Sequence, residues 1–208
     1  MNEEVVENPI EHEFIEFPKM ARLSREVIIT EKIDGSNAQV LITEDGDIIA
    51  GSRNRWLTLK DDNFGFAAWV DAHKDELLKL GTGRHFGEWW GKGIQRRYGL
   101  TERKFSLFNV RRWAKHGTEP ERIVTGDPRV VKFQEVLPEC CDLVPILFRG
   151  DFCTVAVNKC LDDLRALGSV AAKGFMNPEG VVVFHTAANV GFKKTLEKDE
   201  VPKSLHRR

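Results

Sequence analysis

The sequence has no apolar run long enough to cross a lipid bilayer, which takes about 20 consecutive residues. Its first residues, Met1-Asn2-Glu3-Glu4, are acidic, and no apolar segment of the secretory kind follows them. Internal repeats and low-complexity tracts are missing as well. These absences argue against a membrane or repeat protein. We expect a cytoplasmic protein without membrane contact, whose 208 residues form a single domain with its own core.

The chain also has little net charge and few cysteines. A formal net charge of −1 argues against a protein that coats nucleic acid by bulk electrostatics, and it leaves open binding through a local basic patch. The four cysteines show neither Cys-x-x-Cys spacing nor paired histidines at metal-ligand intervals. Cys140, Cys141, Cys153 and Cys160 are therefore expected to be reduced thiols packed in or near a core.

Several segments have the composition of β-strands. Residues 27–33, Val-Ile-Ile-Thr-Glu-Lys-Ile, are rich in β-branched types and predict a strand that carries Lys32 at its end. Asp45-Gly46 lies between two apolar runs and predicts a hairpin with arms at 38–43 and 48–51. Further strands are predicted at 84–90, 104–110, 130–136, 180–184 and 190–193.

Two segments have apolar residues at helical spacing. The first begins at Asp61-Asp62 and runs to Leu80, where Gly81 ends it. The second begins at Thr154, which can cap a helix, and stops at Gly168. Residues 111–127 are polar and rich in turn residues, and they predict a surface excursion. Strands and helices together predict a mixed α/β protein.

The most informative stretch is 32–37, which has the form Lys-x-Asp-Gly-x-Asn. Other features follow it in a fixed order: Arg53, Gly87-Glu88, Phe108, Glu179-Gly180 and Lys193-Lys194. The set resembles the covalent nucleotidyltransferase superfamily of polynucleotide ligases and capping enzymes, and is most similar to ATP-dependent RNA ligases of the phage type that join double-stranded RNA. The resemblance covers about residues 27–195.

This resemblance implies an α/β (α+β) nucleotidyltransferase fold, related to the ATP-grasp architecture, with antiparallel sheets around a nucleotide cleft. It also implies one adenylation domain over 1–208, without the C-terminal accessory domain of most relatives. Residues 196–208 are then a short basic tail. We expect weak affinity for nucleic-acid ends, or a partner protein that completes the substrate clamp.

In such a protein Lys32 is the nucleophile that takes AMP from ATP. A lysine near pKa 10.4 is neutral in only about one molecule in a thousand at pH 7, so the site must favour the neutral amine. Partial burial and nearby cations do so, and the candidates are Arg53, Lys193 and Lys194. The same cations would stabilise charge on the phosphates. Taken alone, without the other motifs, Lys32 would be read first as a solvated lysine at a strand end.

The resemblance implies that one of the two adjacent lysines touches the α-phosphate. The more common pattern is Lys-x-Lys, from which Lys193-Lys194-Thr195 departs. Neighbouring strand residues point to opposite faces, so only one of the pair can face the nucleotide. We favour Lys193, and the choice stays open.

Residues near Lys32 are also assigned to nucleotide binding by resemblance. Glu31 and Ile33 flank the nucleophile, and Glu31 is expected on the base side of the pocket. Asp34 fills an acidic position that orients the turn or interacts with Lys32. Asn37 matches an asparagine that contacts phosphate or ribose, and its alternative role is that of a turn residue.

Arg53 matches an arginine that contacts the nucleotide and later the 5′-phosphate, with Arg55 as the alternative. Phe108 matches the aromatic residue that stacks on the purine, which needs a flat apolar face. Phe105 is the competing candidate, and core packing is the other explanation for Phe108.

Glu88 lies in an aromatic strand, where a carboxylate needs a partner, and hydrogen bonds to ribose hydroxyls would supply one. Basic and aromatic residues follow it, and we expect this cluster to contact the nucleic-acid backbone unless it is only a solvated loop. Its members are Trp90, Lys92, Arg96, Arg97 and Tyr98.

Glu179 opens an apolar strand and matches a glutamate that holds a divalent cation. Mg²⁺ (or Mn²⁺) prefers oxygen ligands and keeps several waters, so one or two carboxylates suffice. Pro178-Glu179-Gly180 is also an ordinary turn sequence.

The sequence thus predicts an ATP-dependent RNA ligase that joins 5′-phosphate and 3′-hydroxyl ends of nicked or broken RNA through a lysyl-AMP intermediate. An RNA–DNA hybrid or DNA is the other polymer to consider, since nothing in the sequence recognises a 2′-hydroxyl. Three alternatives stay open: a DNA ligase, a capping-type guanylyltransferase, and an inactive nucleotide-binding relic.

Overall fold

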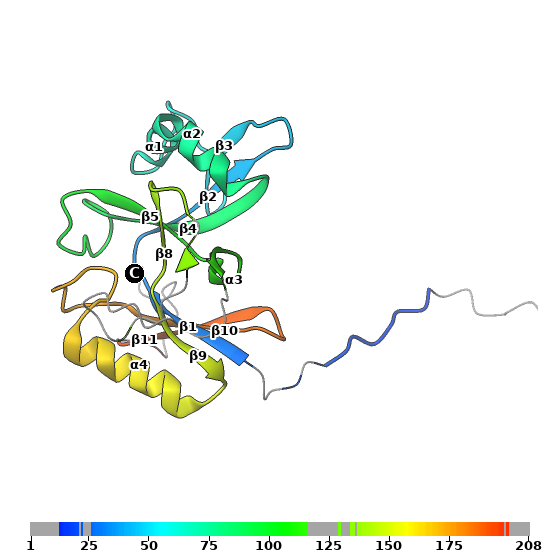
Figure 1. The fold of residues 1–208 in the computed structure, drawn as a ribbon, viewed down its shortest axis with the longest axis vertical. Coiled ribbons are helices and arrows are strands. Elements are labelled where there is room, and N and C mark those ends of the chain that lie inside the picture. The colour runs from blue at the N-terminus through cyan, green and yellow to red at the C-terminus, as the bar shows by residue number, and fades with distance from the viewer. Residues whose placement is uncertain are drawn as a thin grey trace, which may run out of the picture.

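The chain was analysed as a computed structural model, which describes residues 13–20, 22, 26–115, 129, 134–135, 137–197 and 199. Two sheets face each other in a mixed α/β fold, which confirms the predicted fold class (Figure 1). Strands of the larger sheet are β3 (Ile48–Ser52), β2 (Ser36–Ile42), β4 (Gly83–Gly91), β5 (Arg103–Leu107) and β8 (Cys141–Leu143), in this order across the sheet. Strands of the smaller sheet are β11 (Val190–Thr195), β10 (Gly180–His185), β1 (Glu26–Lys32) and β9 (Ile146–Asp151).

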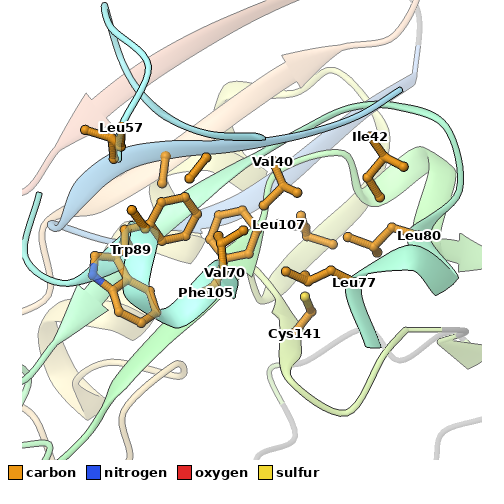
Figure 2. Packing of buried hydrophobic residues seen from close by; sticks show 14 of the residues in the cluster. Val40, Ile42, Leu57, Val70, Leu77, Leu80, Trp89, Phe105, Leu107 and Cys141 are labelled. Carbon is orange, nitrogen blue, oxygen red and sulfur yellow. The ribbon is translucent and has the colours of Figure 1, made fainter. Parts of the chain in front are cut away.

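The larger sheet buries one face and leaves much of the other open. Its pairs are antiparallel except for β5 with β8. Alternate residues such as Val40, Trp89 and Leu107 point to one face, where they form a core (Figure 2). Helix α1 (Phe66–Ala72), the single turn α2 (Lys74–Leu77) and the 3₁₀ turn Leu78–Leu80 contribute apolar side chains to this core. The period of two predicted from sequence is therefore present.

The smaller sheet is antiparallel throughout and packs against α4 (Thr154–Leu167), which runs along it (Figure 1). Val27, Ile29 and Val181 from the strands meet Leu161 and Leu164 from the helix. A third apolar cluster joins the two sheets and includes Ile28, Ile33, Trp90, Tyr98 and Val144. This cluster lies next to the end of β1, so it holds the sheets together beside Lys32.

The first predicted helix is wrong in its extent. Instead of one helix over 61–80, α1 starts at Phe66 after Gly65, whose φ of 71° is left-handed, and the helix breaks at His73. The predicted acidic start has another use, because the Asp62 carboxylate accepts hydrogen bonds from the amides of Ala67 and Ala68. The cap predicted for α4 is also wrong: Thr154 is its first residue, and Cys153 is the N-cap without a side-chain hydrogen bond.

Other differences concern strands. β5 ends at Leu107, because the chain turns there into α3 (Val110–Trp113). Of the predicted strand 130–136, only 134–135 is described, as β7 (Gln134–Glu135) paired with β6 (Ala114–Lys115). Residues 116–127 of the predicted excursion lie outside the described residues, as does most of the basic tail. β8 and β9 were not predicted.

The remaining expectations concern cysteines and membranes. Cys141 and Cys160 are buried as predicted and Cys140 is half-buried, whereas Cys153 is exposed at the start of α4. In the part of the chain that the structure describes, no helix combines the length and apolarity of a membrane span.

Candidate active site

Lys32 is the last residue of β1 and lies on the floor of a cleft between the sheets. β1 pairs with β10 so that Lys32 is opposite Gly180. This register places Nζ of Lys32 2.5 Å from Oε2 of Glu179, whose side chain is only 2% exposed. The two residues are 147 positions apart in the sequence and form one site. The group in contact with the amine is thus a carboxylate, and the predicted cations Arg53 and Lys193 line the same cleft.

The turn after Lys32 is held by hydrogen bonds from its own backbone. The amide of Asp34 donates to the Tyr98 hydroxyl at 2.8 Å, and the amide of Gly35 donates to Oε1 of Glu88 at 2.8 Å. A Cβ at Gly35 would lie 2.5 Å from the Trp89 carbonyl oxygen, which no side chain tolerates. Gly35 therefore allows the turn to pass close to β4.

Glu88 is buried and has protein partners for its carboxylate. Besides Gly35, it accepts a hydrogen bond from Nδ2 of Asn37 at 3.0 Å. Burial raises the pKa of Glu88 to about 7, and the carboxylates of Glu179 and Asp34 add to the rise, against the Gly35 hydrogen bond and the charge of Lys32. The contact predicted between Glu88 and the ribose hydroxyls remains a prediction. Glu88 and Asn37, which are hydrogen-bonded to each other, would together face the ribose in the cleft.

This raised pKa gives a prediction for stability. The native carboxyl binds its proton up to about pH 7, whereas the unfolded one loses it near its ordinary value of 4.5. The free energy of unfolding should therefore fall as pH rises from 4.5 to 7, by at most about 3 kcal/mol from this group, and then level off. Denaturant melts of wild type and Glu88→Gln across this range would measure it. The Gln variant keeps the side-chain shape and cannot titrate, so equal pH profiles for the two proteins would contradict the prediction.

The predicted basic and aromatic cluster does not form a nucleic-acid surface. Trp90 and Tyr98 are 1% and 2% exposed and belong to the cluster that joins the sheets. Arg96 donates from Nε to Oδ2 of Asp34 at 3.0 Å and from Nη1 to the Asn177 carbonyl at 2.9 Å and its side-chain oxygen at 2.7 Å. Arg96 therefore ties the turn after Lys32 to the segment before Glu179. Only Lys92 and Arg97 are exposed as predicted.

The cleft has a volume of about 1200 Å³ and is lined by residues from both sheets. Eight of the predicted site residues line it: the nucleophile Lys32 and the nucleotide-binding candidates Glu31, Ile33, Asn37, Arg53, Glu88, Phe108 and Lys193. Glu179 contacts the cleft through Lys32. The structure thus brings together nine of the ten predicted site residues, and Lys194 is the exception.

The two adjacent lysines lie on opposite faces of β11, as expected of a strand. Lys193 is paired with Val182, and both line the cleft. Lys194 is opposite Val181, which is in the core next to α4, and its ammonium group is 3.2 Å from Oδ2 of Asp199. Lys193 is therefore the lysine that the fold directs at the cleft.

The structure also distinguishes the members of the two other pairs of candidates, because only one residue of each pair lines the cleft. Arg53 lines the cleft, whereas Arg55 forms an ion pair with Asp61 at 2.5 Å. Phe108 lines the cleft and is 41% exposed, whereas Phe105 is fully buried in the larger sheet's core. Phe108 follows the last residue of β5 and lies beside Phe86, which also lines the cleft.

Glu31 has a structural contact that the sequence did not predict. Its buried carboxylate accepts hydrogen bonds from Oγ of Ser169 at 2.6 Å and from the amides of Val170 and Ala171 at 2.8 and 2.9 Å. Burial raises the pKa of Glu31, and these three hydrogen bonds oppose the rise. The carboxylate therefore anchors the loop after α4 to the cleft floor. Nothing in the sequence around Ser169 pointed to it.

Sequence reasoning also missed Phe86 and Arg111, which line the cleft. Phe86 had a usable signal, because it lies two residues before Glu88 on a predicted strand and so on the same face. Arg111 had none, because α3 was not predicted.

The family model described as RNA ligase matches residues 25–198. No curated protein matches the chain. Solved structures of RNA ligase from Naegleria gruberi are similar to this chain. An apo lysine-to-alanine variant is 20% identical with a TM-score of 0.53, and the match covers 85% of this chain and 52% of that one. A variant with ATP and Mn is 23% identical (TM-score 0.54, 85% of this chain and 52% of that one), and a variant with AMP and Mn is 19% identical (TM-score 0.54, 86% of this chain and 53% of that one). At these identities the likeness shows the fold. The chain spans about half the length of these solved relatives.

Proposed function

The chain belongs to the RNA ligase family, and on this premise we propose that it is an ATP-dependent RNA ligase that works through Lys32. Lys32 takes AMP from ATP, the AMP passes to a 5′-phosphate end, and a 3′-hydroxyl attacks that end with AMP leaving. One observation carries the proposal: the Lys32 amine and the Glu179 carboxylate meet 2.5 Å apart on the floor of a large cleft. Solved relatives with ATP and Mn or with AMP and Mn support the choice of nucleotide.

In the first step a bond forms between Nζ of Lys32 and the α-phosphorus, and the bond from that phosphorus to the pyrophosphate oxygen breaks. The amine must give up a proton, and its contact with Glu179 must open so that its lone pair can attack. Arg53 and Lys193 line the same cleft and would stabilise charge on the phosphates. Phe108 offers a half-exposed ring for the purine.

The residues present fit a divalent cation. Glu179 offers a buried carboxylate next to Lys32, and carboxylate oxygen is a ligand that Mg²⁺ and Mn²⁺ accept. The described residues contain no group of three or more His, Cys, Asp or Glu that could hold a metal, so phosphate oxygens and water would complete the coordination. A bound cation would supply positive charge that stabilises the phosphates.

Covalent labelling tests the proposal directly. The protein is incubated with ATP or GTP labelled at the α-phosphate, with Mg²⁺ or Mn²⁺, and separated under denaturing conditions. We expect label from ATP only, and preferential sealing of a nicked RNA duplex over a nicked DNA duplex. Label from GTP would indicate capping-type chemistry, and preference for DNA a DNA ligase. No label with either nucleotide would leave a nucleotide-binding relic and contradict the proposal.

Substrate and partner are part of the same proposal. The substrate is nicked or broken RNA with a 5′-phosphate and a 3′-hydroxyl. A further polypeptide that contacts the RNA would raise the affinity, because the net charge of the chain is only −1. Sealing rates at increasing salt, with and without cell extract, would reveal such a contribution.

Arg96 gives a second test of this mechanism. Arg96→Ala removes the link between Asp34 and Asn177, so the turn after Lys32 and the segment before Glu179 are held together less firmly. We expect AMP transfer to slow about 10- to 100-fold at saturating ATP, with little change in ATP affinity, because misplacement of reacting groups lowers the rate more than the binding. Single-turnover labelling gives the rate, and equilibrium binding gives the affinity.

Two further variants of this loop serve as controls. Arg96→Lys keeps the charge and cannot bridge both partners, so it should recover only part of the rate. Lys92→Ala removes an exposed cation from the same loop and should transfer AMP like wild type. Equal rates for Arg96→Ala and wild type would show that the link has no part in positioning.

A further inference from the structure

The open face of the larger sheet carries aromatic side chains beyond the nucleotide cleft. Phe108 and Phe86 line the edge of the cleft and are 41% and 50% exposed. Trp56 lies outside the cleft lining and is 45% exposed. An antiparallel sheet can leave one face to solvent, and that face is then normally polar. Half-exposed aromatic rings in a group therefore point to something that covers them.

The register shows that these side chains share one face. Phe86 is opposite Gln39, and the amide of Phe108 donates to the Phe86 carbonyl, so Phe108 continues the same row. A Cβ at Gly51 would be 3.0 Å from the Trp56 ring and 2.8 Å from the Gln39 side chain, so Trp56 lies over Gly51 beside Gln39. The row thus runs from Phe108 through Phe86 and Gln39 to Trp56.

Arginine accompanies the aromatic row. Arg84 is two residues before Phe86 on β4 and so on the same face. Its guanidinium carbon is 5.2 Å from the centre of the Trp56 ring, and its Nη1 donates to the Gln39 side chain at 3.1 Å. Between Glu88 and the hairpin turn, the paired positions of β2, β3 and β4 on this face carry no acidic residue. We name Trp56, Arg84, Phe86 and Gln39 the aromatic face.

We propose that, when the substrate is broken RNA rather than a nicked duplex, the aromatic face binds the unpaired nucleotides next to the end being joined. This inference rests on the proposed function and adds the place where the polymer lies. Stacking on aromatic rings with arginine nearby is how proteins hold single-stranded bases, and it suits any base sequence. Two features favour this occupant: the face is continuous with the cleft through Phe86, and its charged side chain is a cation.

The size and borders of the surface agree with this occupant. The cleft of about 1200 Å³ exceeds the roughly 300–1000 Å³ typical of small-molecule sites, so it has room for more than one nucleotide. At the far end, Glu44, Asp45 and Asp47 form the hairpin turn, where phosphates would be repelled. A bound strand would therefore run from the cleft to Trp56 and end there.

Tryptophan fluorescence of the full chain tests the proposal, with a short oligouridylate as the probe. Trp56 is the most exposed of the five tryptophans, since the others are buried or half-buried. We expect the oligouridylate to quench this fluorescence, and inorganic polyphosphate of similar length to leave it unchanged. We also expect Trp56→Leu to bind the oligouridylate about tenfold more weakly, within the range of about 5- to 150-fold expected for loss of one stacked base. Trp56→Phe should keep most of the affinity and lose the quench.

Controls separate this inference from the proposed function. Phe152→Leu alters a half-exposed aromatic next to the other sheet and should bind like wild type. Trp56 is outside the cleft lining, so Trp56→Leu should label with ATP at the wild-type rate, which also shows that it folds. Normal labelling of the wild type without quenching would overturn the inference alone, and so would equal oligouridylate affinity for Trp56→Leu and wild type. Concentration-dependent dimers that the oligouridylate does not dissociate would mean that a second copy covers the face, and would also overturn it.

Discussion

Lys32→Arg should abolish covalent labelling with α-labelled ATP, by more than about 10⁴-fold relative to wild type, because a guanidinium stays protonated and has no lone pair to offer. Lys32→Ala should do the same by removing the nucleophile altogether. The arginine variant is the more informative one, since it keeps a positive charge beside the buried Glu179 carboxylate. An uncompensated buried carboxylate destabilises a fold, so the alanine variant alone could lose activity by unfolding.

Lys194→Ala is the matched control for this experiment. Lys194 follows Lys193 on β11, its ammonium group pairs with Asp199, and it does not line the cleft. It should label like wild type. Thermal melts of all three variants would show whether they are folded. Labelling of folded Lys32→Arg at the wild-type rate would mean that another residue carries the AMP.

Much of the site was predictable because local signals and the order of short motifs agree. β1, the β2–β3 hairpin and β4 follow from β-branched content and alternation, and these strands carry Lys32, Asn37 and Glu88 into the cleft. The sequence predicts that Lys193 and Lys194 point to opposite faces of β11. It does not say which of these faces meets the cleft, so it could not decide between the two lysines. That depends on the pairing of β11 with β10, a tertiary feature.

Predictions failed where composition suggested a surface and tertiary packing decided otherwise. Trp90, Tyr98 and Arg96 look like a nucleic-acid patch in sequence because basic and aromatic residues alternate there. In the fold the two rings fill the space between the sheets, and Arg96 links segments 62 and 81 positions away from it. Phe86 does face solvent, although it lies on β4 only four residues before the buried Trp90, and Trp56 faces solvent in the segment after β3. Burial of each ring is set by which strand pairs with which, and a local window does not contain that.

The contact between Lys32 and Glu179 is the feature that no local pattern contained, and it gives the second large prediction. Glu179→Gln keeps the shape of the side chain and a hydrogen-bond acceptor for Lys32, and it removes the charge. We expect AMP transfer to fall about 10²-fold or more, because the site loses a ligand for the cation that stabilises the phosphates. Initial labelling rates over a range of Mg²⁺ and Mn²⁺ concentrations would measure the loss, and half-saturation should move to higher metal concentration.

The metal dependence distinguishes two roles for Glu179. If the carboxylate served only as an ion-pair partner that holds Lys32, Glu179→Gln would lower the rate equally at all metal concentrations and leave half-saturation where it is. If it binds the cation, excess Mn²⁺ should restore part of the rate. Glu102→Gln removes an exposed carboxylate outside the cleft and should change neither quantity. The position of a single buried carboxylate, set by the register of β1 with β10, would then couple the nucleophile to the metal in one site.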